Sequence, residues 1–196
     1  MGRWEPNARE RLERAALELF VGEGFAETTV PQITARAGLT TRTFFRHFAD
    51  KREVLFADED ELPALVARLM AEAPAALSPM MVIVQGLQTF AAARFDGRHD
   101  YLRTRRAVIQ ADEGLREREL RKLSALSGAI TQGFLNRGVD ELTSTLAAQI
   151  AVAVFSVSVS RWLDGDAERP LTPLLHETLG ALQSVVADSP ELRHDP

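Results

Sequence analysis

Apolar residues recur at helical spacing along almost the whole chain, and this pattern constrains the fold more than any other feature. Leu12, Ala16 and Phe20 lie on one face of a first helix, which Gly22 ends. Strand-like alternation is found mainly over residues 152–159, where small Ala and Ser residues favour a helix. The sequence therefore predicts an all-α fold of about nine helices.

Composition narrows the class of protein. The chain has 196 residues, 45% apolar and 26% charged, which are ordinary values for one or two globular domains. The absence of cysteine excludes disulfide scaffolds, thiolate zinc sites and cysteine nucleophiles. The N-terminus shows no apolar signal segment, so we expect a cytoplasmic protein. Two uncharged stretches, 73–93 and 142–160, contain several polar residues and are expected to pack against protein, not lipid.

Residues 29–48 predict two short helices joined by a tight turn. Thr29 is placed to cap the first helix, and Gln32 completes a capping box. Gly38 suits a left-handed helix end, and Thr40 is placed to cap the second helix. Two short helices joined in this way form a helix-turn-helix motif.

The second of these helices has two chemically different faces. Phe44 and Phe48 are expected to anchor it. Short polar side chains followed by cations are what a helix in the major groove of DNA needs. Residues 1–52 also carry a net charge of +2, from nine basic and seven acidic residues, against −7 in the remainder. The residues left on the outer face are Thr40, Thr41, Arg42, Thr43, Arg46 and His47.

This N-terminal region resembles the tetracycline-repressor (TetR) family of transcriptional regulators. The resemblance implies a three-helix DNA-binding head, residues 1–52, and a helical effector-binding and dimerisation body, residues 53–196. It also implies a homodimer on a palindromic operator, with no cofactor. The matching residues are Ala16, Leu19-Phe20, Gly24-Phe25, Thr28-Thr29, Ile33, Ala37-Gly38-Leu39, Thr43-Phe44-Phe45, His47-Phe48, Asp50-Lys51 and Val54-Leu55.

The resemblance also implies which residues touch DNA. Base contacts would come from Thr40, Thr41, Arg42 and Thr43, and phosphate or nearby contacts from Thr28, Thr29, Phe45, Arg46, His47 and Lys51. The family often has Tyr where this chain has Phe45, and that hydroxyl reaches a phosphate. Because Phe45 has no hydroxyl, we expect Arg46 to supply the contact.

Beyond the head, helical patterns continue to the end of the chain. Pro63 is expected to break or kink the first of these helices. The acidic run 58–61 is interpreted as a solvated face and not as a cation site, because adjacent helical residues point in different directions. The expected helices cover about residues 51–70, 78–95, 98–111, 113–136 and 140–163, with a last one opening at Thr172-Pro173.

Two further surfaces are expected on this body. An effector pocket should be mostly apolar with a few polar groups. Its candidate residues are Met81, Val84, Gln88, Phe90, Arg94, Tyr101, Arg105 and Phe134. The resemblance places the dimer interface on the last two helices, with candidates Ala148, Val152, Phe155, Leu175, Leu179 and Leu182.

The predicted function is a ligand-responsive repressor, and two alternatives stay open. The chain has four histidines but no nucleophile elbow, glycine-rich phosphate loop or zinc-protease motif, which argues against an enzyme without excluding one. The other alternative is a DNA-binding regulator controlled by a protein partner or by no ligand. A filled body core would favour that alternative, and an enclosed pocket would favour a small-molecule effector.

Overall fold

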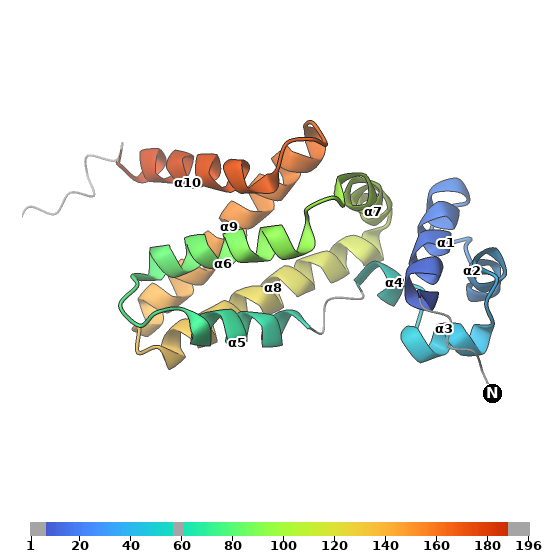
Figure 1. Cartoon of the computed structure of the whole chain (residues 1–196), viewed down its shortest axis with the longest axis horizontal. Coiled ribbons are helices and arrows are strands. Elements are labelled where there is room, and N and C mark those ends of the chain that lie inside the picture. Colours follow the sequence, from blue (N-terminus) through green and yellow to red (C-terminus); the bar gives the residue numbers. More distant parts are fainter. Residues whose placement is uncertain (1–6, 57–60, 188–196) are drawn as a thin grey trace, which may run out of the picture. The chain divides into compact units, whose positions relative to one another are not determined.

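A computed structural model describes residues 7–56 and 61–187, in which all regular secondary structure is α-helical (Figure 1). Ten helices lie in these two ranges, which confirms the all-α prediction. The chain divides into two compact units. The first unit comprises the residues up to Leu62 together with Arg103–Lys122, and the second comprises Pro63–Leu102 and everything after Lys122. The boundary of functional domains expected between residues 52 and 53 stays a prediction.

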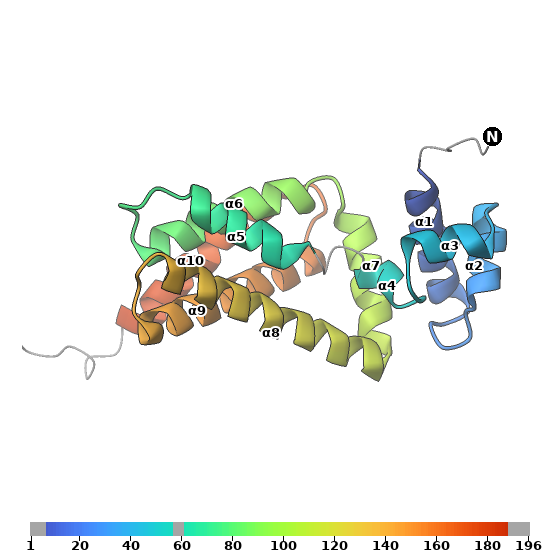
Figure 2. The same cartoon turned by 90° about the horizontal axis from the view of Figure 1, so that it is seen from below.

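The first unit contains a small bundle at the N-terminus. Helix α1 packs against the three helices that follow it (Figure 2). Leu12 of α1, Ile33 of α2 and Phe44 of α3 are completely buried, and they form the centre of this bundle. The four helices are α1 (Ala8–Gly22), α2 (Val30–Ala37), α3 (Thr41–His47) and α4 (Glu53–Phe56).

The ends of α2 are fixed by side chains close in sequence, as predicted. Thr29 and Gln32 form a complete capping box at the start of α2. Gly38 ends the helix at φ 63°, in the left-handed region that favours glycine. A guanidinium nitrogen of Arg11 on α1 lies 2.6 Å from the carbonyl oxygen of Ala37 and satisfies one of the last carbonyls of α2. These contacts set the position of the turn that leads into α3.

The predicted helix over residues 51–70 is divided into two in the structure. Asp50 accepts hydrogen bonds from the amides of Arg52 and Glu53, so it is a cap as predicted, but the helix begins at Glu53. Pro63 lies in the first turn of α5 (Leu62–Glu72), where its missing N–H removes no helical hydrogen bond. The acidic positions 58–60 lie outside the described residues.

The second unit is built from the longer helices. Helix α6 packs against α9 and α10, and these last two helices pack against each other (Figures 1 and 2). Helices α7 and α8 each contribute residues to both units. The bounds lie within a few residues of the predicted ones: α6 (Pro79–Arg94), α7 (His99–Ala111), α8 (Glu113–Asn136), α9 (Glu141–Asp164) and α10 (Leu171–Ala187).

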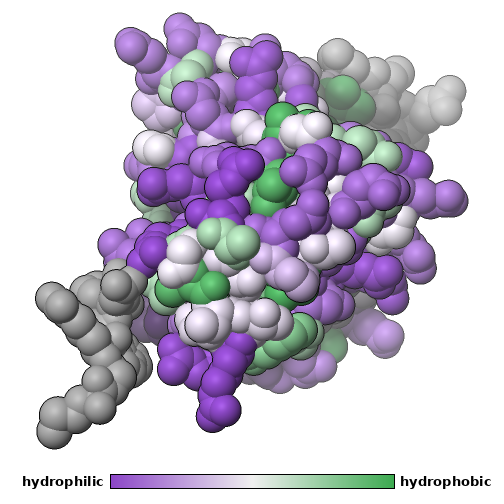
Figure 3. Space-filling model, turned by 90° about the vertical axis from the view of Figure 1, so that its right-hand side faces the viewer, coloured by the Kyte–Doolittle hydropathy of each residue, from purple (hydrophilic) through white to green (hydrophobic). Residues whose placement is uncertain are grey.

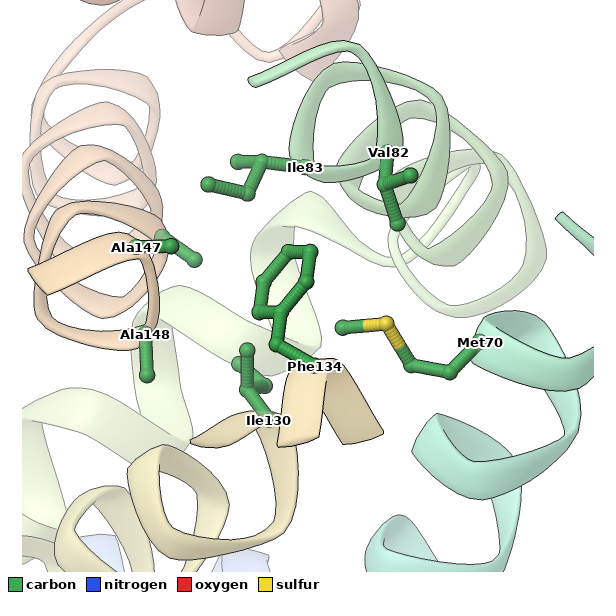
Figure 4. Packing of buried hydrophobic residues seen from close by; sticks show 8 residues of the cluster. Met70, Val82, Ile83, Ile130, Phe134, Ala147 and Ala148 are labelled. Carbon is green, nitrogen blue, oxygen red and sulfur yellow. The ribbon is translucent and has the colours of Figure 1, made fainter. Parts of the chain in front are cut away.

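Phe134 on α8 stands at the centre of one core of the second unit (Figure 4). Its ring faces Met70 from α5 and Val82 and Ile83 from α6, and all four side chains are buried. Gly133 allows the close approach of α5, because a Cβ at this position would lie 2.7 Å from Cγ of Met70.

Helix α9 has apolar residues on every face and charged residues only near its ends. Among the described helices it alone has the length and composition that could cross a membrane. The core helix of a soluble protein meets the same criterion, and here α9 packs against α6 and α10. Three of its large apolar side chains nevertheless remain exposed: Leu142, Leu146 and Val157.

Candidate nucleic-acid interface

The outer face of α3 is the candidate interface. Phe44 and Phe48 are buried and hold the helix to the bundle, with their ring centroids 5.4 Å apart. Hydrophilic residues predominate on the face that Figure 3 shows, with smaller hydrophobic areas between them. The residues of α3 that lie exposed are Thr41, Arg42, Phe45, Arg46 and His47.

Arg42 and Arg46 are exposed cations on α3. Within residues 7–56 and 61–187, neither guanidinium forms a hydrogen bond or an ion pair. Both lie four positions apart on an exposed helix face, so both can approach the same polyanion. A guanidinium with unused donors is suited to phosphate oxygens and to the acceptor edge of guanine.

Thr40 and Thr43 are tied to each other at the start of α3. The Thr40 hydroxyl accepts a hydrogen bond from the Thr43 amide at 3.1 Å, and the two hydroxyl oxygens are 3.0 Å apart. Thr40 therefore caps α3 as predicted. The cap positions Thr41 and Arg42 in the first turn, at the point where a recognition helix meets base edges.

Thr28 and Thr29 have internal roles in this structure. Thr28 is completely buried and its hydroxyl donates to the carbonyl oxygen of Gly24 at 2.8 Å. A phosphate contact through this side chain would require the loop to open. The hydroxyl of Thr29 lies 2.7 Å from the side-chain oxygen of Gln32, within the capping box, but Thr29 is exposed.

The ammonium group of Lys51 is held by backbone carbonyl groups of the loop between α1 and α2. Its ammonium group donates to the carbonyl oxygens of Phe25, Ala26 and Thr28 at 2.7, 2.9 and 2.8 Å. It also lies 4.6 Å from the centroid of the Phe25 ring, a cation–π distance. An ammonium has three donors, so all are used. The predicted phosphate contact of Lys51 stays a prediction, and sequence spacing gave no signal for these carbonyl partners.

The candidate pocket residues differ in burial and in the unit to which they belong. Phe134 is fully buried in the core around Met70, whereas Met81 is 46% exposed. Arg105 belongs to the first unit, where it bonds the carbonyl oxygen of Leu55 at 2.6 Å and a carboxylate oxygen of Glu119 at 3.2 Å. The guanidinium group of Arg105 is therefore already engaged in contacts within the protein, and its predicted effector role stays a prediction.

The remaining pocket candidates lie in the second unit, near a row of aromatic rings. Phe90 and Phe95 each lie within 6 Å of Phe155 on α9. Gln88 lies two residues before Phe90, and its side-chain nitrogen is 2.7 Å from Nε2 of His176 on α10. Three further candidates are placed on α6 and α7: Val84 packs against the core beside this row, Arg94 ends α6, and Tyr101 stacks with Arg98.

The predicted dimer residues differ in exposure, and their contact with a partner stays a prediction. Ala148, Leu175 and Leu179 are 0%, 1% and 7% exposed, so they belong to the core of the protomer. Val152, Phe155 and Leu182 are partly buried against the same cores. Periodicity could not separate the two faces of α9, because both carry apolar residues. The large apolar side chains of α9 that lie exposed are Leu142, Leu146 and Val157.

Comparison with known proteins agrees with the head geometry. Residues 13–57 match the family model described as bacterial regulatory proteins, tetR family. The HTH-type transcriptional regulator TcmR of Streptomyces glaucescens is 30% identical over 157 residues, covering 75% of this chain and 67% of TcmR.

Solved structures agree with the fold of the whole chain. A TetR-family regulator from Syntrophomonas wolfei matches with a TM-score of 0.62 at 14% identity, covering 95% of this chain and 98% of its own. Thermus thermophilus FadR, a TetR-family repressor in complex with lauroyl-CoA, matches with a TM-score of 0.54 at 25% identity, covering 89% and 93%. This chain therefore belongs to the TetR family and is a transcriptional regulator with an N-terminal helix-turn-helix DNA-binding domain.

Proposed function

We propose that the chain is a homodimeric repressor that binds a palindromic operator through α3 and is released by a small molecule. The observation that carries this proposal is a pair of cations, Arg42 and Arg46, that have no partner within the described residues, on an α3 anchored by the buried Phe44. The protein then acts in the cytoplasm and by binding, not by catalysis.

The experiment is a selection of bound duplexes from a random DNA library at two salt concentrations. We expect an enriched palindrome, with binding that weakens steeply as salt rises because phosphate contacts release counterions. Arg42→Ala should lose about 1–3 kcal/mol and relax sequence preference at one position of each half-site. Arg36→Ala is a matched control, since its guanidinium is engaged with Glu18 at 3.1 Å. Unchanged affinity for Arg42→Ala would exclude base contact by this residue.

Dimerisation is supported by the exposed apolar stripe of α9. Leu142 and Leu146 are one turn apart, and Val157 lies three turns further along the same face, with exposed fractions of 70%, 53% and 50%. A stripe of this kind on a soluble protein favours contact with another protein surface. Two copies would place their recognition helices about 34–36 Å apart to enter successive major grooves.

A charge placed within this stripe tests the dimer. Leu146→Arg should give monomers in sedimentation equilibrium and lose cooperative operator binding, because an unpaired cation is costly in an apolar interface. Leu120→Arg is the control, since Leu120 is 66% exposed but belongs to α8 in the first unit and not to the stripe. A Leu146→Arg protein that remained dimeric would place the interface elsewhere.

Release by a small molecule is supported by T. thermophilus FadR, which is bound to lauroyl-CoA in its solved structure. A ligand shifts the DNA-bound population only through its different affinities for the two conformations. Within the first unit, Arg105 provides a mechanical link between α7 and α4. Its guanidinium lies 5.2 Å from the Phe56 ring, and Arg118 of α8 lies 4.8 Å from the same ring.

If Arg105 links α7 to α4, its substitution should impair the response to an effector without impairing operator binding. Arg105→Met keeps much of the side-chain volume but removes the bonds to Leu55 and Glu119. The variant should bind operator and respond poorly to an effector found by screening against the operator complex. A variant with unchanged response would show that α7 and α4 are coupled by other contacts.

A further inference from the structure

Phe45 is the exposed apolar residue of the recognition helix. Its side chain is 56% exposed, and no other large hydrophobic residue of α2 or α3 is exposed to that extent. It shares a face with Thr41 and Arg42, which precede it by four and three positions. Covering a phenyl ring that is exposed to water lowers the free energy. The position of the exposed Phe45 ring on the DNA-facing side therefore requires an explanation.

The ring of Phe45 packs against one buried aromatic neighbour. Phe44 stands edge-on to it, with ring centroids 5.4 Å apart and an interplanar angle of 85°. Phe44 is itself completely buried and packs against Phe48. One side of the Phe45 ring is therefore held by a fixed neighbour, while the remainder is available to a partner.

The chemistry of the ring restricts what that partner is. Phe45 has neither a hydroxyl group nor a charge, so it forms no hydrogen bond with phosphate. The apolar feature of the major groove is the C5 methyl group of thymine, which pairs with apolar side chains including Phe. The neighbouring Thr41 and Arg42 supply hydrogen-bonding groups for adjacent base edges.

We propose that Phe45 contacts the C5 methyl group of one thymine in each half-site and makes α3 selective for thymine there. This inference rests on the proposed function, because it requires α3 to enter the major groove.

Substitution of thymine by uracil tests the contact directly. Uracil pairs like thymine and lacks only the C5 methyl group. In the selected operator, each thymine pair related by the dyad is replaced in turn, and affinity is measured by fluorescence anisotropy. At one pair we expect a loss of about fourfold per half-site, the transfer free energy of one buried methyl group expressed as a ratio.

Variants identify the residue that senses the methyl group. With Phe45→Ala, replacement of the same thymine pair should change affinity by less than about twofold, because the two perturbations remove one shared contact. With Arg42→Ala, the loss at that pair should persist, since Arg42 reads another position. Thermal unfolding of Phe45→Ala should match that of the unmodified chain, because the side chain is largely exposed.

Each other outcome overturns the inference. A selected half-site without thymine, or one in which every replacement is neutral, excludes methyl recognition. A loss that persists in Phe45→Ala assigns the methyl contact to another side chain. Failure to select any duplex refutes the proposed function itself, and a tight duplex with no methyl effect refutes only the role of Phe45.

Discussion

Lys51→Met separates two roles for one cation: a tie within the head and a contact to DNA phosphate. Methionine keeps most of the aliphatic chain and removes the ammonium. The variant loses bonds to the carbonyl oxygens of Phe25, Ala26 and Thr28, of which the bond to Ala26 is exposed. Because water replaces part of this set, we expect a net cost of about 2 kcal/mol. In a chain of this length that lowers Tm by about 4–8 °C.

The dependence of DNA affinity on salt distinguishes the roles. Each phosphate-contacting cation that is removed makes the plot of log affinity against log salt less steep by about 0.9. A substitution present in both protomers of a dimer therefore reduces the steepness by about 1.8. We expect Lys51→Met to unfold earlier and keep the slope of the unmodified chain, measured below the onset of unfolding. Arg46→Met is the control, and we expect it to lower the slope without changing Tm, since Arg46 has no partner in the described residues.

The opposite pattern would refute this reasoning. If Lys51→Met kept its Tm and reduced the slope as Arg46→Met does, the ammonium would turn outward to phosphate when DNA is bound. The carbonyl contacts would then belong to the free protein alone. A decrease of both Tm and slope would show that the ammonium serves both roles.

Four further substitutions test the body and its helix ends. Arg137→Met removes three hydrogen bonds to carbonyls at the end of α5 and should cost about 2 kcal/mol in urea unfolding. Gly133→Ala places a Cβ 2.7 Å from a side-chain carbon of α5 and should destabilise by about 1–3 kcal/mol. Gly128→Ala on the same helix meets nothing within 4 Å and should stabilise by about 0.5–1 kcal/mol, so equal effects at the two glycines would refute the steric argument. The hydrogen bonds from the backbone amide and side chain of Thr143 lower the pKa of Asp140 from 3.8, so the cap stabilises α9 above that pH and is lost as pH falls through the lowered pKa. Asp140→Ala should therefore have a lower Tm at pH 7, with a deficit that shrinks below pH 3.8; a deficit independent of pH would exclude ionisation of Asp140 as the cause.

The head could be predicted from the sequence because its geometry is encoded locally. Thr29 with Gln32, Gly38 and Thr40 each fix a helix end within four residues, and each was found where predicted. The bonds of Lys51 were not predictable in the same way, because they join it to carbonyls more than twenty residues earlier.

The body was predictable in its helices and less so in its surfaces. Helix bounds follow periodicity and turn residues such as Gly138, which has φ 80° as expected of a left-handed helix end. Which face of α9 is buried depends on the neighbours that pack against it. Both faces carry apolar residues, so Ala148 could not be distinguished from Leu146 before the fold was known. Arg105 was similarly ambiguous, because its partners Leu55 and Glu119 lie on other helices.

The caps of α2 and α3 have a thermodynamic consequence. These helices have eight and seven residues, and isolated helices shorter than about 12–15 residues are marginal in water. Here the capping box at Thr29, the Thr40 cap and the buried Phe44 form both helices before DNA arrives. Association with DNA then needs to order neither α2 nor α3. In calorimetry, the heat capacity of binding should reflect only the dehydration of the surfaces that meet, without the large additional decrease that accompanies coupled folding.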